Sequence, residues 1–344
     1  MTEPGPYLLR LYAENKPRFE FKAETDWTSW REELRESFAA RIGVVANCER
    51  VQDTKETSVI LLERKTCEGY IRERVEWTTF DGMRMPVYLL IPEGMSGPRP
   101  AVVACHGHGY GSREIVGLMP DGSEREGNPG LHKDFAVELV KQGYVVAAPE
   151  LLGFGDRRLE EDVKAGPRQS SCFRLSAHLM MLGRNIAGVR VAETMQVVSY
   201  LQSRKEVNPR QIGCMGISGG GLVAAFAAAL DERIGAAVVS GYANTFEDSI
   251  LNRAHCLDNY IPGILLDAEL PELIGLIAPR PLLIESGDQD LVFPRRGAER
   301  ALERISLIYA AVGAQESLKV DYFQGGHEIG GAQAYRWLKQ LESL

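Results

Sequence analysis

Residues 211–221 read Gln-Ile-Gly-Cys-Met-Gly-Ile-Ser-Gly-Gly-Gly, and this stretch decides the fold. A short apolar run leads into the G-x-S-x-G pattern of residues 216–220, and an alanine-rich run follows at once. The order predicts a strand, a sharp turn and a helix, with Ser218 held on the turn as a nucleophile. Such a turn strains the serine backbone and is possible only where the neighbouring residues carry no side chain. Because glycine-rich turns also match this pattern by chance, the interpretation depends on partners elsewhere in the chain.

The composition excludes several classes of protein. The chain of 344 residues is long enough for one large α/β domain or two small ones. Its formal net charge of −8 argues against a nucleic-acid partner, which would favour clustered Lys and Arg. No apolar run reaches the length of about 18 residues that a membrane span needs. The first six residues lack a basic region before an apolar core, so we expect no secretory signal and a cytoplasmic protein.

The cysteines and histidines show no metal-binding spacing. Six cysteines are scattered without a C-x-x-C pair, which favours free thiols in a reducing compartment over a disulfide framework. Cys105 and Cys214 lie in apolar runs, where a reduced cysteine behaves as a small buried hydrophobe. His106 and His108 are two residues apart, but no carboxylate or cysteine cluster accompanies them in the sequence. We therefore predict no metal site and no cofactor.

The apolar pattern predicts an α/β fold. Residues 57–64, 68–78 and 84–91 are rich in β-forming residues and indicate an antiparallel meander. From Pro98 onwards, apolar strand-like runs alternate with helical stretches, which is typical of a parallel sheet covered by helices. We expect an α/β-hydrolase type of fold, with a mostly parallel sheet of eight strands and helices on both faces.

The N-terminal part is predicted to be an extension of this domain. Within residues 14–42 the side chains of Trp27, Trp30, Leu34 and Phe38 recur at helical spacing, which predicts an amphipathic helix. We expect an N-terminal helical and β extension over residues 1–75 and a catalytic domain over residues 76–344. The amphipathic face packs either on the catalytic domain or on another subunit of a homo-oligomer.

Two later strand ends supply partners for Ser218. A serine hydroxyl needs a base to take its proton, and the base needs an acid to hold it in one tautomer. The apolar run 281–285 ends in a polar turn with Asp288 and Asp290, and the last apolar run ends in a glycine pair and His327. We predict Asp290 as the acid and His327 as the base, with Asp288 more suited to shaping its turn. Two other aspartates stay open as alternatives for the acid, Asp248 and Asp258.

A glycine loop is placed to stabilise an oxyanion. Residues 105–111 read Cys-His-Gly-His-Gly-Tyr-Gly and close the first predicted parallel strand. Attack on a carbonyl creates an oxyanion that needs preorganised N–H donors, each contributing about 2.7–4 kcal/mol. We predict the backbone N–H groups of His108 and Gly219 as these donors.

With these four motifs in this order, the chain resembles the α/β-hydrolase superfamily over about residues 80–344. It is most similar there to the dienelactone hydrolase and acetyl xylan esterase-like group of serine carboxylesterases. The segments behind this narrower resemblance are 106–109, 255–263 and 278–287. The resemblance implies a serine esterase without a metal, acting on small-molecule esters of short acyl groups, including acetyl esters of sugars. Dienelactone hydrolases proper use a cysteine nucleophile, whereas this chain has Ser218, which favours ester chemistry.

The pocket is predicted less sharply. Segment 241–275 is rich in Tyr, Asn, His and Leu and either lines a pocket or packs as a helical excursion on the sheet edge. Arg157 or Arg158 is expected to face the mouth of the site. The candidates for substrate contact are His106, Glu150, Tyr242, His255 and Tyr260.

Two other functions stay open from the sequence. A serine peptidase of the prolyl-oligopeptidase type shares this catalytic core, but the N-terminal 75 residues are too few for its propeller. A non-catalytic binding protein on the same fold is the second alternative. Such proteins commonly lose a member of the triad, and all three candidates are present in this chain.

Overall fold

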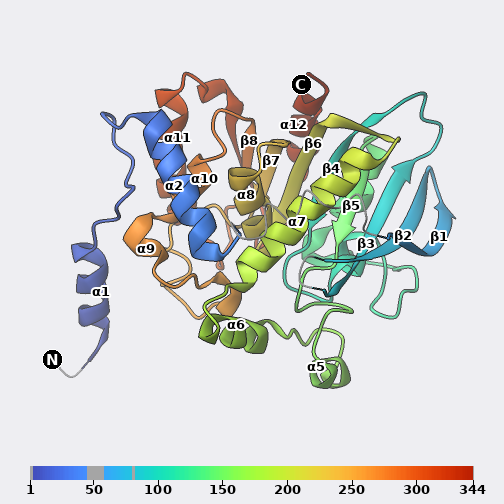
Figure 1. Ribbon diagram of the computed structural model, residues 1–344, viewed down its shortest axis with the longest axis horizontal. Helices are drawn as coiled ribbons and strands as arrows, with labels where there is room; N and C mark the ends of the chain where they lie inside the picture. The colour runs from blue at the N-terminus through green and yellow to red at the C-terminus, as the bar shows by residue number, and fades with distance from the viewer. Residues whose placement is uncertain (1–2, 45–57, 80–81, 344) are drawn as a thin grey trace.

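A single mixed sheet organises the chain. The computed structural model describes residues 3–44, 58–79 and 82–343 (Figure 1). Within them, nine strands form one sheet in the order β1-β2-β3-β5-β4-β6-β7-β8-β9. Their bounds are β1 Ile60–Cys67, β2 Tyr70–Thr78, β3 Arg84–Pro92, β4 Arg99–Cys105, β5 Val145–Pro149, β6 Val207–Ile217, β7 Ile234–Ser240, β8 Leu282–Gly287 and β9 Leu318–Phe323. The predicted α/β fold is confirmed, with nine strands in the described sheet rather than eight; the predicted strand over residues 57–64 corresponds to β1, which pairs with β2 as an exposed edge strand.

The strand directions bring the ends of the later strands together. Strands β1, β2 and β3 pair antiparallel, and β3 is antiparallel to β5. From β5 onwards the neighbours β4, β6, β7, β8 and β9 are all parallel. The carboxyl ends of parallel strands meet at one edge of a sheet, where the loops that follow them form a site. The proposed boundary between residues 75 and 76 falls inside β2, and the division into two parts stays a prediction.

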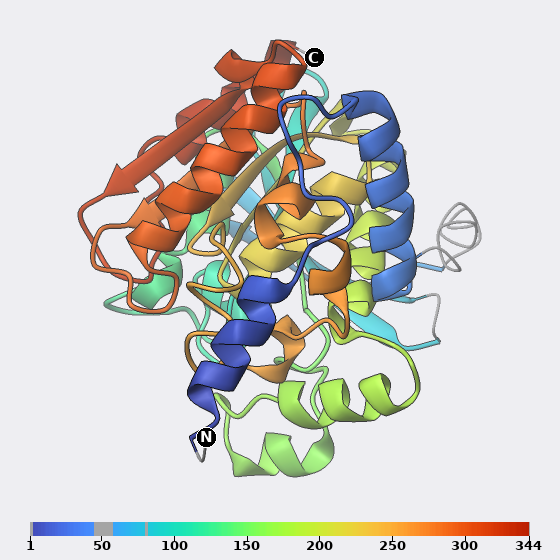
Figure 2. The ribbon, with the colours of Figure 1, turned by 90° about the vertical axis from the view of Figure 1, so that its left-hand side faces the viewer.

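Helices cover both faces of the sheet (Figure 2). Alternate residues of β4 show this: Ala101 and Val103 belong to one buried cluster, and Val102 and Ala104 belong to the other. The first cluster includes side chains of α2 Trp27–Ile42, α7 Ile186–Ser203, α8 Gly219–Leu230, α10 Leu270–Gly275 and α11 Arg295–Ala311. The second includes side chains of α4 Phe135–Lys141, α12 Ala334–Trp337 and the 3₁₀ segment η6 Leu338–Ser343. In the described ranges, no helix has the length and apolar character needed to cross a bilayer.

The remaining helices lie in the connections. The N-terminal α1 (Gly5–Glu14) buries none of its residues and stands away from the sheet in Figure 1. The predicted helical region 170–205 consists of two helices, with a break between α6 and α7. The other helices in loops are α5 Glu160–Ala165, α6 Cys172–Met181 and α9 Ile264–Asp267.

The predicted amphipathic segment is α2, and it packs on this same chain. Asp26 caps its start by accepting a hydrogen bond from the Ser29 N–H at 3.0 Å. The side chains that α2 buries are Trp30, Leu34, Phe38 and Ile42. The Phe38 ring meets Phe226 of α8 edge to face at 4.8 Å. The apolar face of α2 therefore covers α7 and α8, and the alternative of packing on another subunit is not needed to bury it.

The contact between α2 and α7 gives a stability prediction. A methyl group on Gly188 of α7 would overlap the carbonyl oxygen of Ile42. Alanine favours a helix by up to about 1 kcal/mol over glycine, but overpacking a core against backbone costs about 1–3 kcal/mol. We expect Gly188→Ala to lower the free energy of unfolding in urea, whereas Gly97→Ala, with open space around it, leaves it unchanged. Equal stability of the two variants would contradict this packing of α2.

Candidate active site

The turn at Ser218 has the strained geometry that the sequence predicts. Ser218 lies between β6 and α8 with φ 56° and ψ −125°, a region that residues with a side chain rarely adopt. A Cβ atom on Gly216 would overlap the carbonyl oxygen of Gly220, and one on Gly220 would overlap that of Cys105. Both glycines are thus required for the strand and helix to meet this closely. Ser218 itself stays partly accessible to solvent.

Two backbone N–H groups lie free beside this turn. Gly219 is the first residue of α8, where the N–H has no partner within the helix. The loop after β4 lies against the turn, since a Cβ on Gly107 would be 3.2 Å from the Ser218 Cβ and one on Gly219 would be 3.2 Å from His108 Nδ1. Among the described residues, neither the His108 nor the Gly219 N–H has a hydrogen-bond acceptor. The predicted oxyanion donors are therefore unpaired among the described residues and belong to two segments that lie against each other.

The structure joins His327 to Asp290. His327 Nδ1 lies 2.8 Å from Asp290 Oδ2, and the histidine side chain is 17% exposed whereas the carboxylate is buried. The other oxygen, Asp290 Oδ1, accepts hydrogen bonds from the Val292 and Phe293 N–H groups at 2.7 and 2.9 Å. The carboxylate is thus held by backbone on one side and by the imidazole on the other.

The competing aspartates lie elsewhere. Asp288 accepts a hydrogen bond from the Gly325 N–H at 3.0 Å in an exposed turn, which is the turn-shaping place expected for it. Asp248 pairs with Arg300 at 2.5 Å. Asp258 is buried and pairs with Arg190 at 2.6 Å. Of the four candidates, only Asp290 hydrogen-bonds His327 in the described structure.

A glycine lets this pair approach the nucleophile turn. The Ser218 N–H donates to the Ser240 carbonyl at 3.0 Å, so the turn is tied to the end of β7. The next residue, Gly241, has φ +52°, and a Cβ there would lie 3.1 Å from His327 Cε1 and 3.5 Å from Asp290 Oδ2. The imidazole and carboxylate therefore pack directly on the backbone that supports Ser218.

A buried histidine supports the loop after β4. The Gly107 N–H donates to His132 Nε2 at 2.9 Å, so this nitrogen carries no proton. Burial lowers the pKa of His132, although the nearby Glu114 carboxylate opposes this in part. Glu114 also accepts the Tyr110 N–H at 2.9 Å. His132 and Glu114 thus fix both ends of the loop segment that carries His108. Neither residue could be predicted from the loop motif, because both lie outside it.

The sequence of the chain matches a family model and a curated relative. A family model described as "Abhydrolase family" matches residues 8–325. The chain belongs to the abhydrolase family. A relative from Bacillus subtilis (strain 168), named "Putative hydrolase YtaP", is 31% identical over 253 residues, covering 71% of this chain and 78% of that protein. The predicted membership of the α/β-hydrolases is confirmed.

Solved structures share the fold of this abhydrolase-family chain. One is named "putative acetyl xylan esterase" from Bacteroides fragilis NCTC 9343, with a TM-score of 0.78 and 20% identity, covering 94% of this chain and 82% of that one. Another is a glucuronoyl esterase from Solibacter usitatus, with a TM-score of 0.65 and 16% identity, covering 96% and 99%. At these identities the likeness concerns the fold.

Several predicted pocket residues of this abhydrolase are structural. His106 is fully buried, with Nδ1 2.8 Å from the Gly107 carbonyl and Nε2 accepting the Leu151 N–H at 3.2 Å. Glu150 is buried and binds the backbone and hydroxyl of Ser112 at 2.9 and 3.0 Å. Because these groups are shielded from solvent and already paired, we correct both assignments from substrate contact to support of the loop.

The arginines expected at the mouth of the site are also occupied. Arg157 forms a buried two-bond pair with Glu193 at 2.7 and 2.5 Å. Arg158 donates to the carbonyl groups of Gly155 and Gly166 at 2.7 and 2.6 Å. Both guanidinium groups are thus tied to this chain's own carboxylate or carbonyl oxygens.

Phe293, which was not predicted from the sequence as a site residue, contacts two of the other predicted pocket residues. Phe293 stacks on His327 at 5.8 Å and contacts the His255 ring at 5.3 Å and the Tyr242 ring at 5.1 Å. Tyr242 is fully buried, and Tyr260 donates its hydroxyl hydrogen to the Ile250 carbonyl at 3.3 Å. His255 is partly exposed, and burial lowers its pKa. His255 is thus the predicted pocket residue best placed to reach a ligand beside His327.

The neutral state of His132 gives a prediction for pH dependence. The unfolded chain binds a proton at this residue near pH 6.5, whereas the folded chain resists protonation because the pKa is lowered. The free energy of unfolding should therefore fall as pH drops below about 6.5, by at most about 1.4 kcal/mol per pH unit for this one group. His132→Gln keeps an acceptor for the Gly107 N–H without titrating, so its stability should fall less between about pH 7.5 and about pH 5.5 in urea denaturation. An unchanged pH slope in the variant would contradict the assignment.

Proposed function

We propose that this abhydrolase-family protein is a serine hydrolase that cleaves carboxylic esters through an acyl-enzyme. The observation that carries the proposal is the 2.8 Å hydrogen bond from His327 Nδ1 to Asp290, held beside the strained turn of Ser218. With its Nδ1 proton donated to the carboxylate, the imidazole presents an unprotonated Nε2. That nitrogen is the general base that a serine nucleophile requires.

In the first step the ester is attacked. His327 Nε2 takes the hydroxyl proton of Ser218 as its oxygen adds to the ester carbonyl, and buried Asp290 stabilises the imidazolium that forms. The negative charge moves onto the carbonyl oxygen. We assign the free N–H groups of His108 and Gly219 to donate hydrogen bonds to that oxygen, and Gly219 lies at the positive end of α8.

In the second step the acyl-enzyme forms and is then hydrolysed. His327 gives its proton to the leaving alcohol oxygen as the bond to the acyl carbon breaks. A water molecule then adds to the acyl-enzyme while His327 again acts as base. Collapse of this second intermediate returns the proton to Ser218 and releases the carboxylic acid.

The substrate we propose is a short-chain acyl ester, such as an acetyl ester of a sugar. The supporting observations are the names of the fold neighbours, which include acetyl xylan and glucuronoyl esterases. The side chain placed to meet such a substrate is His255, partly exposed and packed on Phe293 next to His327.

The alternative functions have less support. Before β3 the described residues form only α1, α2, β1 and β2, without the propeller expected of a prolyl-oligopeptidase-type peptidase. A binding protein without catalysis would have no need of a strained serine and a buried acid–histidine pair next to each other. These observations favour the esterase.

The triad assignment is tested with four variants assayed on an aryl acetate. Ser218→Ala should lower kcat/KM by about 10⁴-fold or more, and Asp290→Asn by about 10⁴-fold, because each removes part of the base-activated nucleophile. Asp288 lies in an exposed turn and Ser203 at the end of α7, both outside the triad. Asp288→Asn and Ser203→Ala should therefore keep kcat/KM within about 3-fold of the value for the unmodified enzyme.

Thermal unfolding of each variant separates lost chemistry from lost structure. A Ser218→Ala protein that folds normally and keeps more than a small fraction of the activity would contradict the nucleophile. Equal losses in Asp288→Asn and Asp290→Asn would contradict the choice of acid.

The acyl preference is tested separately with a panel of esters of one alcohol. We expect kcat/KM to be highest for acetyl esters and to fall as the acyl chain lengthens. An added methylene gains about 0.8 kcal/mol only where apolar surface of the protein buries it, and a site for short acyl groups would not offer that surface. A kcat/KM that rises steadily to long chains would contradict the short-acyl proposal and leave the triad untouched.

A further inference from the structure

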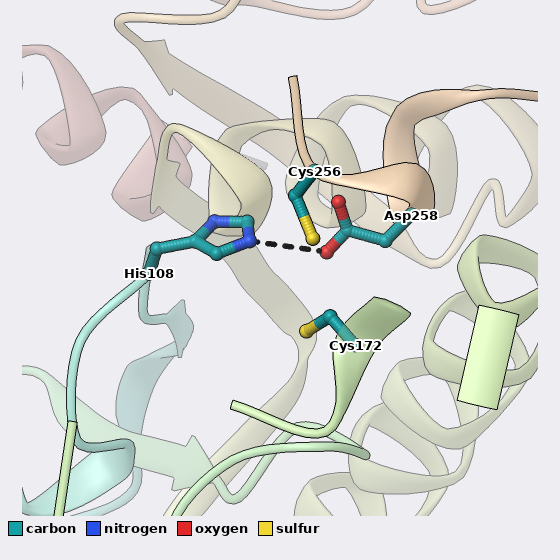
Figure 3. A group of neighbouring side chains, drawn as sticks. All are labelled: His108, Cys172, Cys256 and Asp258. Atoms are coloured by element: carbon teal, nitrogen blue, oxygen red, sulfur yellow. Dashed lines mark ion pairs between the residues drawn. The ribbon is translucent and has the colours of Figure 1, made fainter. Parts of the chain in front are cut away.

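Four potential metal ligands lie close together where the loop after β4 meets two other segments of the chain. They come from three separate segments: His108 from the loop, Cys172 from the start of α6, and Cys256 and Asp258 from the region around the 3₁₀ turn Leu257–Asn259 (Figure 3). One imidazole nitrogen, two sulfur atoms and one carboxylate oxygen all lie within 4.8 Å of one another. Both cysteines are free thiols. Sequence spacing gave no sign of this group because the fold alone brings the segments together.

The separations fit one small ion. His108 Nε2 lies 3.4 Å from Asp258 Oδ2, the ion pair drawn in Figure 3. Two such ligands on a tetrahedral zinc, each at about 2.0–2.2 Å from the metal, would be roughly 3.4 Å apart. Thiolate ligands lie at about 2.3 Å from zinc. The distance between a thiolate and another ligand atom is then slightly longer than 3.4 Å, and the 4.8 Å limit on the distances in this group allows it.

One ligand atom makes no hydrogen bond in the described parts of the chain and has only the 3.4 Å ion pair with Asp258 there. His108 Nε2 is shielded from solvent and makes no hydrogen bond within the described residues, although it faces the cluster. A buried polar atom without a partner costs about 1–3 kcal/mol. Coordination of a cation at this nitrogen would remove that cost.

The surrounding charge fits a divalent cation. Arg190 is fully buried and donates to Asp258 Oδ2 at 2.6 Å and to Cys172 Sγ at 3.0 Å. Once a metal has displaced both thiol protons, two thiolates and one carboxylate would carry three negative charges, of which Arg190 offsets one. A divalent ion would make the buried group neutral, and the remaining Asp258 oxygen is held by the Asn259 side chain at 2.8 Å.

The ligand types select the metal. Two sulfurs, one imidazole and one carboxylate favour zinc over calcium or magnesium, which prefer oxygen ligands alone. Four protein ligands leave no open position, which is the arrangement of a structural rather than a catalytic zinc.

We propose that His108, Cys172, Cys256 and Asp258 bind one structural Zn²⁺. The ion ties the loop after β4 to α6 and to the 3₁₀ turn, and so holds the backbone of His108 beside Ser218. The proposal is independent of the ester chemistry, because metal binding is measured without a substrate.

The test uses the whole protein without a histidine tag. It is incubated with Zn²⁺, dialysed and analysed for metal by mass spectrometry, and we expect about one zinc per chain. Co²⁺ in place of zinc should give intense ultraviolet thiolate-to-cobalt bands and the visible bands of tetrahedral coordination. These spectra need no variant and report directly on sulfur ligands.

Matched variants locate the site. Cys172→Ser and Cys256→Ser should each weaken zinc binding at least about 100-fold, since loss of a group that only supports a ligand already costs about 10–100-fold. Cys67→Ser, which removes a free thiol distant in sequence from the cluster, should bind zinc like the unmodified protein. Circular dichroism confirms that each variant is folded.

Four results would overturn the proposal. The folded protein could retain no zinc, or bind cobalt without thiolate bands, or contain a disulfide between Cys172 and Cys256 in peptide mapping without reductant. Equal loss of zinc in the Cys67→Ser control would likewise show that binding is not at this cluster.

Discussion

The close meeting of β6 and α8 at Ser218 is the constraint on which the site depends. The serine can hold φ at 56° only because Gly216 and Gly220 carry no side chains where strand, helix and the end of β4 come into contact. A turn of this kind stores backbone strain that the surrounding structure has to sustain. Here the buried alanine-rich helix α8 and the parallel strands on either side of β6 supply that support.

The parallel sheet turns distant sequence segments into neighbours. Ser218 follows β6, Asp290 follows β8 and His327 follows β9, and the ends of these strands meet at one edge of the sheet. Gly241, at the end of the intervening strand β7, leaves the space in which the imidazole and carboxylate pack. The positions of Ser218, Asp290 and His327 therefore follow from the ends of parallel strands and from the space that Gly241 leaves.

The residues that follow the ends of strands could be predicted from the sequence. The contacts among buried polar and aromatic side chains could not. Ser218 and His327 stand next to glycines after apolar runs, and Asp290 lies three residues beyond Gly287 in the turn after another such run. His106 and Glu150 also follow apolar runs, yet both side chains are buried. His132, Arg190 and Phe293 were missed because their roles arise only from contacts between segments far apart in the chain.

Covalent labelling tests directly whether Ser218 is the activated nucleophile. The protein is treated with an organophosphonate that modifies activated serines, and the modified peptide is located by mass spectrometry. We expect one adduct, on Ser218. Well-folded protein that stays unlabelled, or that carries the adduct on another serine, would contradict it.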